Sequence, residues 1–222
     1  DDMRMVYDNI FTYNATWDAK HNFEAMGGTS ATTSVWEQLW GERSYFNPDH
    51  IIIGLNGGNN AGLRGNSQSK SEWSIMSFLG RVSYNYDSKY YITANVRADG
   101  SSKLAPGHRW GYFPSVSTAW RVSGEDFMES VTWTNDLKVR LSWGQSGNQS
   151  GLGDYAWVRK YAMLYYDWTD PDYSTAVPSL GAETSKGYRD LTWETTTQTN
   201  IGIDWSMFDS RLTVTMDAYY KY

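Results

Sequence analysis

The sequence predicts an all-β protein, more specifically the wall of an antiparallel transmembrane β-barrel. Three observations predict it. Apolar and polar residues alternate with period two along most of the chain, tight turns alternate with long loops, and aromatic residues gather at the ends of the alternating segments. Strands place successive side chains on opposite faces, and a spanning strand turns its apolar face to lipid and carries rings near the membrane surfaces. The 12 Trp and 17 Tyr among 222 residues fit that expectation.

The first four expected strands form two pairs, each joined by a tight turn. Segments 5–17 and 21–33 flank Asp18-Ala19-Lys20, and segments 72–86 and 90–100 flank Asp87-Ser88-Lys89. The alternation is clearest in segment 90–100, which is apolar at Ile92, Ala94 and Val96 and polar at Thr93, Asn95 and Arg97. One face of each strand is therefore expected to be free of charge.

The next four expected strands lie near 109–123, 137–147, 194–206 and 211–222. Residues 124–136 separate the first two, and Glu125–Met128 within them fits one helical turn, while Met207–Ser210 joins the last two tightly. Pro114 lies inside segment 109–123 and has no N–H to give to a neighbouring strand. The sequence therefore predicts a bulge at Pro114.

Strand length and loop size favour a membrane barrel over a soluble β-sandwich. Several segments reach a dozen residues, whereas soluble strands average about 5–6 and tilted spanning strands need about 9–11. The long loops are expected near 34–71 and 148–193, and outer-membrane barrels carry such loops on the outer side. Two alternatives stay open: a secreted, Trp-rich carbohydrate-binding β-sandwich, and a small closed structural or adhesion barrel of eight strands.

Ordered motifs in the second half of the chain add a family resemblance. They are SFLGRVSYNY at 77–86, YITANVRADGSS at 91–102, RWGYFPSVS at 109–117, and the segments 137–148 and 193–202. Together they closely resemble the SusC/RagA family of TonB-dependent outer-membrane transporters, strongly over most of 70–222 and weakly over 1–69. Pro114 belongs to the family's pattern at its strand.

The resemblance implies that residues 1–222 are a partial barrel domain, about eight consecutive strands of a roughly 22-stranded, plugged barrel. The N-terminal plug and the remaining strands would lie outside this chain. It further implies the outer membrane of a Gram-negative, Bacteroidetes-like bacterium, a SusD-like lipoprotein lid, and a TonB complex contacted through the absent N-terminal part. The substrate would be a glycan or oligosaccharide in some members and a peptide in others.

Other classes of function find no support in the residues. The net charge of −6 argues against a nucleic-acid partner. The histidines His21, His50 and His108 form no zinc-hydrolase motif, and Asp167, Asp170 and Asp172 match no calcium loop, so a solvated acidic loop is the simpler interpretation. We expect no enzyme activity, no metal site and no cofactor.

Two sets of residues are candidates for function. Aromatic residues in the expected loops offer flat faces that could stack on sugars or grip peptides, and packing of the loops on themselves or against a lid subunit is the simpler alternative. These residues are Trp36, Trp40, Tyr45, Trp157, Tyr161, Tyr165, Tyr166 and Trp168. Charged residues on the polar faces of the strands are expected to line the barrel lumen and to pair with one another or with the plug; they are Arg81, Arg97, Arg121, Arg140, Glu194, Asp204 and Asp217.

Overall fold

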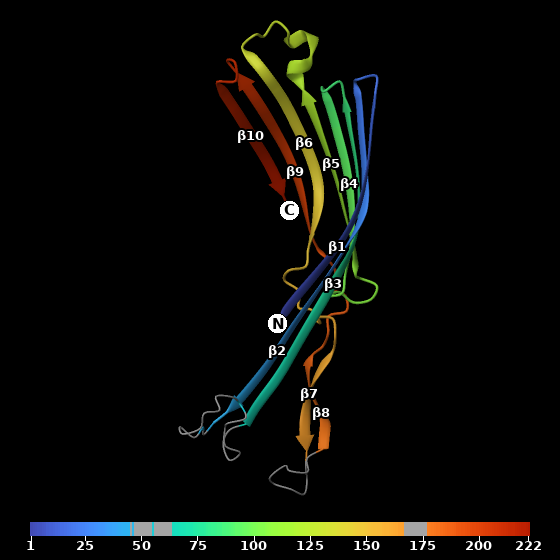
Figure 1. Cartoon of the computed structure of the whole chain (residues 1–222), viewed down its shortest axis with the longest axis vertical. Coiled ribbons are helices and arrows are strands. Elements are labelled where there is room, and N and C mark those ends of the chain that lie inside the picture. The colour runs from blue at the N-terminus through green and yellow to red at the C-terminus, as the bar shows by residue number, and fades with distance from the viewer. Residues whose placement is uncertain (45, 47–54, 56–63, 167–176) are drawn as a thin grey trace.

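The computed structural model describes residues 1–44, 46, 55, 64–166 and 177–222, and most of its strands form one antiparallel sheet of eight. The strand order is β1-β2-β3-β4-β5-β6-β9-β10, so each strand pairs with the next one in the chain except β6, which pairs with β9 across the β7–β8 segment. Figure 1 shows this sheet as a single curved wall, with a separate β7–β8 hairpin beyond one end. The strands are β1 (Asp2–Trp17), β2 (His21–Arg43), β3 (Arg64–Tyr86), β4 (Tyr90–Ser101), β5 (Trp110–Arg121), β6 (Thr134–Asn148), β7 (Lys160–Tyr166), β8 (Val177–Ser185), β9 (Glu194–Met207) and β10 (Leu212–Lys221).

All eight predicted strands are present, which confirms the all-β, antiparallel prediction. The loop bounds near 34–71 were wrong, because β2 continues to Arg43 and β3 begins at Arg64. These two strands pair residue by residue as far as Arg43 and Arg64, as a ribbon that projects past the sheet (Figure 1). Backbone hydrogen bonds hold the two strands of such a ribbon together whatever side chains it carries. Its apolar and polar residues therefore need not alternate. The predicted loop 148–193 likewise contains β7 and β8.

Tight turns lie at one end of the wall, hereafter the short-turn end, as the spacing predicted. The first turn has positive φ at Asp18 (50°) and Ala19 (54°), and the second at Asp87 (51°) and Ser88 (54°). Two consecutive left-handed residues match the twist of paired strands. The β5–β6 connection lies at the same end and contains two short 3-10 helices, η2 (Val122–Gly124) and η3 (Asp126–Met128), where one helical turn was expected.

The wall has almost no core. Among the described residues only Leu104, Ala105, Phe113 and Met207 are buried apolar side chains. A sandwich would bury one whole face of each sheet against another, and in the described part of the chain no second sheet packs on the eight strands. Among the described strands β1 and β10 each have a single neighbour, so the eight strands do not close on themselves. Both alternatives kept open from the sequence therefore fail. No helix of the described residues is long and apolar enough to cross a membrane.

The pairing of β5 with β6 ends beside Pro114. The β4–β5 register runs through Pro114 without a shift, so the predicted bulge is wrong. Instead the β5–β6 ladder ends at the pair Ser115 and Gly144, directly beside the proline. A residue without an N–H cannot donate to a ladder. Towards the other end of the wall, hereafter the long-loop end, β5 and β6 are therefore no longer paired.

Candidate functional site

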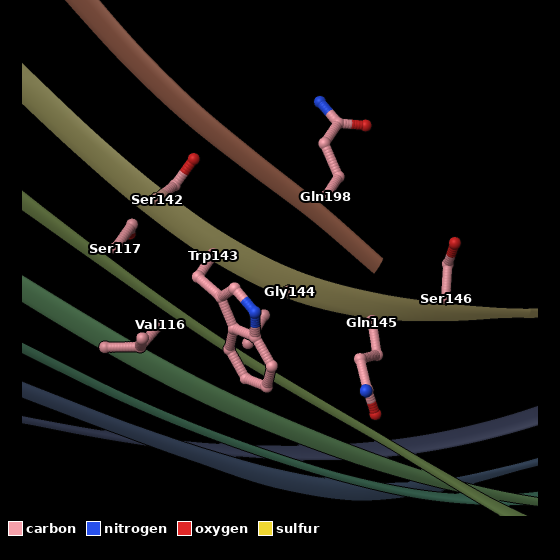
Figure 2. A pocket seen from close by; sticks show the side chains of 9 residues that line it. Val116, Ser117, Ser142, Trp143, Gly144, Gln145, Ser146 and Gln198 are labelled. Atoms are coloured by element: carbon pink, nitrogen blue, oxygen red, sulfur yellow. The ribbon is translucent and has the colours of Figure 1, made fainter. Parts of the chain in front are cut away.

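The two faces of the wall carry different chemistry. Figure 2 shows Ser117 and Ser142 on one side of β5 and β6, and Val116 and Trp143 on the other. We call the side with Ser142 the polar face and the side with Trp143 the apolar face. The alternation follows directly from the strand period of two.

The apolar face is exposed although it is built from large side chains. Phe78 is 48% exposed, Val96 52%, Leu141 52% and Met216 54%, on four different strands. Large exposed apolar side chains spread over several neighbouring strands mark a contact with lipid or protein rather than water. It covers the middle of the wall, where a spanning strand meets the hydrocarbon of a bilayer.

Aromatic rings form a belt at the short-turn end. The Trp17 and His21 rings stack with centroids 5.3 Å apart, and the series continues from His21 to Tyr86 at 4.9 Å and from Tyr86 to Tyr90 at 6.3 Å. The next member, Trp120, packs against Phe127 with centroids 6.5 Å apart. Amphipathic rings gather where a membrane meets water, so the belt marks the membrane surface.

The Glu125 carboxylate accepts hydrogen bonds from polar groups of two rings of this belt. Its Oε1 accepts a hydrogen bond from the Tyr90 hydroxyl at 2.6 Å and another from Trp120 Nε1 at 3.0 Å. The Tyr90 hydrogen bond, followed by that of Trp120, holds the pKa of Glu125 below its usual range. Lys89 Nζ lies 3.7 Å from the same carboxylate. The carboxylate is thus kept charged at the belt.

On the polar face, Arg140, Asp204 and Asp217 join three strands. Arg140 on β6 donates to both carboxylate oxygens of Asp204 on β9, at 2.7 and 3.1 Å, and its Nη2 lies 3.2 Å from Asp217 Oδ1 on β10. A two-pronged contact of this kind is the strongest arrangement of a guanidinium and a carboxylate. The three charged residues therefore lie together although they are far apart in the sequence.

Gly202 makes this cluster possible. It pairs with Arg140 on one side and with Asp217 on the other, in the middle of β9. A Cβ atom at Gly202 would lie 2.5 Å from Asp217 Oδ1 and 2.8 Å from Arg140 Nη2. The missing side chain leaves the space through which the guanidinium reaches across a whole strand.

The other four predicted charges are also bonded on this face. Arg97 donates to both oxygens of Asp99, at 2.7 and 2.8 Å, and to Ser77. The remaining contacts are Arg121 Nε to Asp136 at 2.6 Å, Arg81 Nε to Ser83 at 3.3 Å, and Asn148 Nδ2 to Glu194 at 2.9 Å. Arg97 and Arg121 are thus paired with carboxylates, whereas Arg81 and Glu194 are hydrogen-bonded to neutral side chains of the wall.

Three residues fasten the segment after β6 to the long-loop end, and we call Ser71, Lys103 and Asp154 the clasp. Asp154 accepts a hydrogen bond from Ser71 and lies 2.9 Å from Lys103 Nζ. Burial acts to raise the pKa of Asp154, but the hydrogen bonds from Ser71 and Lys103 and the charge of Lys103 outweigh it and hold the pKa below its usual range. The clasp therefore stays charged at neutral pH.

A cavity of about 750 Å³ opens beside the clasp, where β5 and β6 separate. Phe113 fills the seam: it is 7% exposed and meets Trp193 edge to face with centroids 5.4 Å apart. Trp193 Nε1 in turn donates to the Arg109 carbonyl at 2.8 Å. The lining comprises Trp73, Ile75, Asn95, Arg97, Asp99, Lys103, Phe113, Ser115, Gln145, Ser146, Gly147, Asn148, Gln149, Ser150 and Trp193.

Sequence reasoning missed the rings of this cavity. Trp73 and Phe113 occupy positions on the polar side of the alternation, two residues before Ile75 and Ser115 in the cavity lining. A large ring among polar neighbours breaks the pattern that defines the rest of that face. That break is the signal by which the cavity could have been found.

The predicted loop aromatics are scattered. Trp36 and Trp40 lie four residues apart on β2, both exposed, and a Cβ atom at Gly65 would lie 2.7 Å from the Trp40 ring. Trp157 Nε1 donates to the Ser102 carbonyl at 3.3 Å, and Tyr161 is the second residue of β7 and is exposed. The backbone of Tyr165 and Tyr166 belongs to β7, while Tyr45 and Trp168 lie outside the described residues.

No ring contact among the described residues joins the β2 pair to Trp157 or Tyr161. Metal-binding side chains are dispersed in the same way: within the described ranges no three His, Asp or Glu residues gather as metal ligands would. His21 belongs to the aromatic belt, and His50 and the Asp167, Asp170 and Asp172 set fall outside the described residues.

The eight strands form a single curved antiparallel sheet. One face is apolar and exposed, the other carries charged side chains that are bonded within the wall, and a belt of rings lies at the short-turn end. These features define the wall of a transmembrane β-barrel. The chain belongs to the TonB dependent receptor-like β-barrel family, whose model matches residues 2–222. This is a family of outer-membrane receptors and transporters rather than of enzymes.

Individual relatives show which members of the family the chain resembles. It is 34% identical over 214 residues to TonB-dependent receptor P39 of Formosa agariphila, covering 96% of this chain and 20% of that protein. It is 33% identical over 165 residues to TonB-dependent receptor SusC of Bacteroides thetaiotaomicron, covering 72% of this chain and 16% of that protein. The chain thus spans about a fifth or less of these relatives' length.

Solved structures agree. The RagAB peptide transporter superposes with a TM-score of 0.84 at 25% identity, covering 99% of this chain and 23% of that chain. The closed-closed state of the RagAB peptide importer gives a TM-score of 0.87 with the same coverage. These matches confirm the SusC/RagA resemblance noted from the motifs.

Proposed function

We propose that the protein to which this wall belongs imports a nutrient across the outer membrane of a Gram-negative, Bacteroidetes-like bacterium. The observation that carries the proposal is the contrast of the two faces. An exposed apolar face suits lipid, and a polar face whose charged side chains are hydrogen-bonded within the wall suits a wet conduit. On this proposal Arg81, Arg97, Arg121, Arg140, Glu194, Asp204 and Asp217 line the lumen.

Import would need parts that these residues do not supply. The chain would be about eight strands of a roughly 22-stranded barrel with a plug, and the TonB complex would act through the N-terminal part. The relatives named for TonB-dependent reception, and the family to which the chain belongs, support this arrangement.

A SusD-like surface lipoprotein is the proposed partner at the long-loop end. The β2–β3 ribbon projects past the sheet in that direction and exposes Leu39 (80%), with Trp36 and Trp40 nearby on β2. A two-stranded ribbon is marginal on its own in water. Contact with a lid, or with a glycan or peptide held beneath it, would give Trp36, Trp40, Trp157 and Tyr161 a role.

Uptake by the intact cell tests this function. A strain lacking the gene should lose accumulation of the nutrient, supplied as fluorescent oligosaccharides or peptides, and collapse of the proton gradient should have the same effect in the parent strain. A tag on the full-length protein should retain a lipoprotein in detergent. Undiminished uptake in the deletion strain for every nutrient tried would contradict the proposal.

A further inference from the structure

Three charged side chains lie directly beside the aromatic belt, and we call Lys89, Glu125 and Asp126 the belt charges. Lys89 ends the tight turn between β3 and β4, and the two acidic residues lie in the connection between β5 and β6. Lys89 Nζ lies 3.7 Å from Glu125 Oε2 and 3.8 Å from Asp126 Oδ1. Because the rings of the belt mark the membrane surface, the belt charges lie at the depth of lipid headgroups.

The belt charges are only loosely paired with one another. A nitrogen-to-oxygen hydrogen bond is about 2.7–3.2 Å long, and both contacts of the Lys89 ammonium are longer. The Glu125 side chain is 16% exposed and already accepts hydrogen bonds from Tyr90 and Trp120. The Asp126 side chain is 98% exposed. A ligand could therefore approach Lys89 and Asp126 without breaking a short bond within the wall.

The Lys89 side chain is held in place before any ligand arrives. A Cβ atom at Gly124 would lie 3.2 Å from Lys89 Cγ and 3.6 Å from its Cε, so the lysine stem packs along bare backbone. The whole side chain is only 23% exposed. The Lys89 carbonyl also accepts a hydrogen bond from the Arg121 N–H at 2.7 Å, which fixes its backbone to β5. A ligand oxygen would meet a cation whose ordering cost is already met by the fold.

Apolar side chains continue from the belt charges towards the middle of the wall. Phe127 follows the two acidic residues and is 63% exposed, although its ring packs on Trp120. Beyond the belt, Ile92 on β4 is 47% exposed and Val116 on β5 is 39% exposed. This surface suits the acyl chains of a lipid whose headgroup lies at the belt charges.

Charge complementarity decides which headgroup fits. A phosphate group suits the Lys89 ammonium, but the two carboxylates outnumber that single cation and repel a headgroup that is wholly negative. An ethanolamine headgroup adds a primary ammonium, which donates up to three hydrogen bonds and suits the exposed Asp126 carboxylate. A choline headgroup has no N–H and cannot donate to Asp126. The belt charges therefore match a phosphate and a primary ammonium together.

We propose that the belt charges and the apolar surface beside them bind a zwitterionic aminophospholipid of the phosphatidylethanolamine class at the short-turn end. Lys89 donates to its phosphate, Asp126 accepts from its ammonium, and its acyl chains lie along the apolar face from Phe127. The inference goes beyond nutrient import and depends on the membrane wall alone. It can therefore fail while the proposed import function stands.

Native mass spectrometry of the full-length protein in detergent tests this site. The probes are dioleoyl phosphatidylethanolamine, phosphatidylcholine and phosphatidylglycerol, each titrated separately, and phosphoethanolamine without acyl chains. Asp126→Asn removes the exposed carboxylate and keeps its shape, and Lys89→Met removes the ammonium but keeps a stem to pack on Gly124. The matched controls are Asp209→Asn and Lys20→Met, which change exposed charges of two other tight turns that have no ion pair within the described part of the chain.

We expect phosphatidylethanolamine to bind most tightly, about fivefold more tightly than phosphatidylglycerol, and Asp126→Asn to abolish that preference. Lys89→Met should weaken phosphatidylethanolamine binding about fivefold, and the two controls should change neither result. Equal or tighter binding of phosphatidylcholine or phosphatidylglycerol, a preference that survives Asp126→Asn, or equal losses in the controls would each overturn the site. Phosphoethanolamine binding as tightly as the lipid would overturn the role of the apolar face.

Discussion

Replacing Gly147 by alanine should expel the Phe113 ring from the seam between β5 and β6. A Cβ atom at Gly147 would lie 2.6 Å from Cε1 and 2.8 Å from Cε2 of Phe113. Real Cβ atoms do not approach a ring so closely, and the tip of this ring also lies over the bare Gly111, where a Cβ atom would be 2.5 Å from its Cζ. The ring must therefore leave its site.

The cost follows from what the ring loses. Phe113 is 7% exposed, and removing a phenylalanine side chain from such a site costs about 1.5–3 kcal/mol. Its edge-to-face contact with Trp193 contributes about 0.5–1.5 kcal/mol more. We expect Gly147→Ala to lower the free energy of unfolding by about 2–4 kcal/mol.

The assay is the midpoint of unfolding of the full-length protein in detergent, followed by its heat-modifiable gel mobility. Gly151→Ala is the control, since a Cβ atom there meets nothing within 4 Å. In a Phe113→Ala background Gly147→Ala should cost almost nothing, because the clash is gone. An equal cost of Gly147→Ala with and without the Phe113 ring would refute the steric reasoning.

Three further predictions concern the lipid face, a turn and the clasp. Val96→Arg should destabilise the folded protein by about 2–4 kcal/mol and Asn95→Arg by clearly less, measured by unfolding in a bilayer; equal costs would show that the faces are reversed. Ala19→Gly should stabilise by about 0.5–1 kcal/mol because φ is 54° at Ala19, whereas Ala15→Gly within β1 should not, by the same thermal assay. The folded pKa of Asp154 is lowered, so its contribution to stability is present above the unfolded value of about 3.9 and is lost as pH falls through the folded value. Asp154→Asn should therefore lower the unfolding midpoint at pH 7 and do so progressively less as the pH falls below about 3.9, and a constant difference across pH would contradict this.

Much of the wall was predictable, because alternation is a local property of a strand. Within β4, the residues from Ile92 to Asp99 were assigned to their faces by period two alone. The β2–β3 ribbon was not predictable from alternation. Beyond Trp36 its residues do not alternate between apolar and polar, and its strands are held together by backbone hydrogen bonds, which do not depend on the type of side chain. The sequence identified Pro114 as an interruption of its strand. The structural consequence, that the β5–β6 pairing ends beside it, also depended on β6, which lies elsewhere in the chain.

The candidate sites were less predictable, for a physical reason. Sequence assigned Arg140, Asp204 and Asp217 to the polar face, yet their contacts join residues 64 and 77 positions apart. Only the register of β6, β9 and β10 brings them together, and only the bare Gly202 between them lets them touch.

The sequence by itself therefore determined that the chain is a membrane wall with one lipid face and one polar face, because a period of two needs no distant partner. Tertiary structure alone decided where that wall parts and what fills the gap. The seam, its Phe113 and Trp193 rings and the cavity beside them arise from how β5 and β6 end their pairing. Such an ending depends on both strands at once, so it cannot be seen in either strand's own residues.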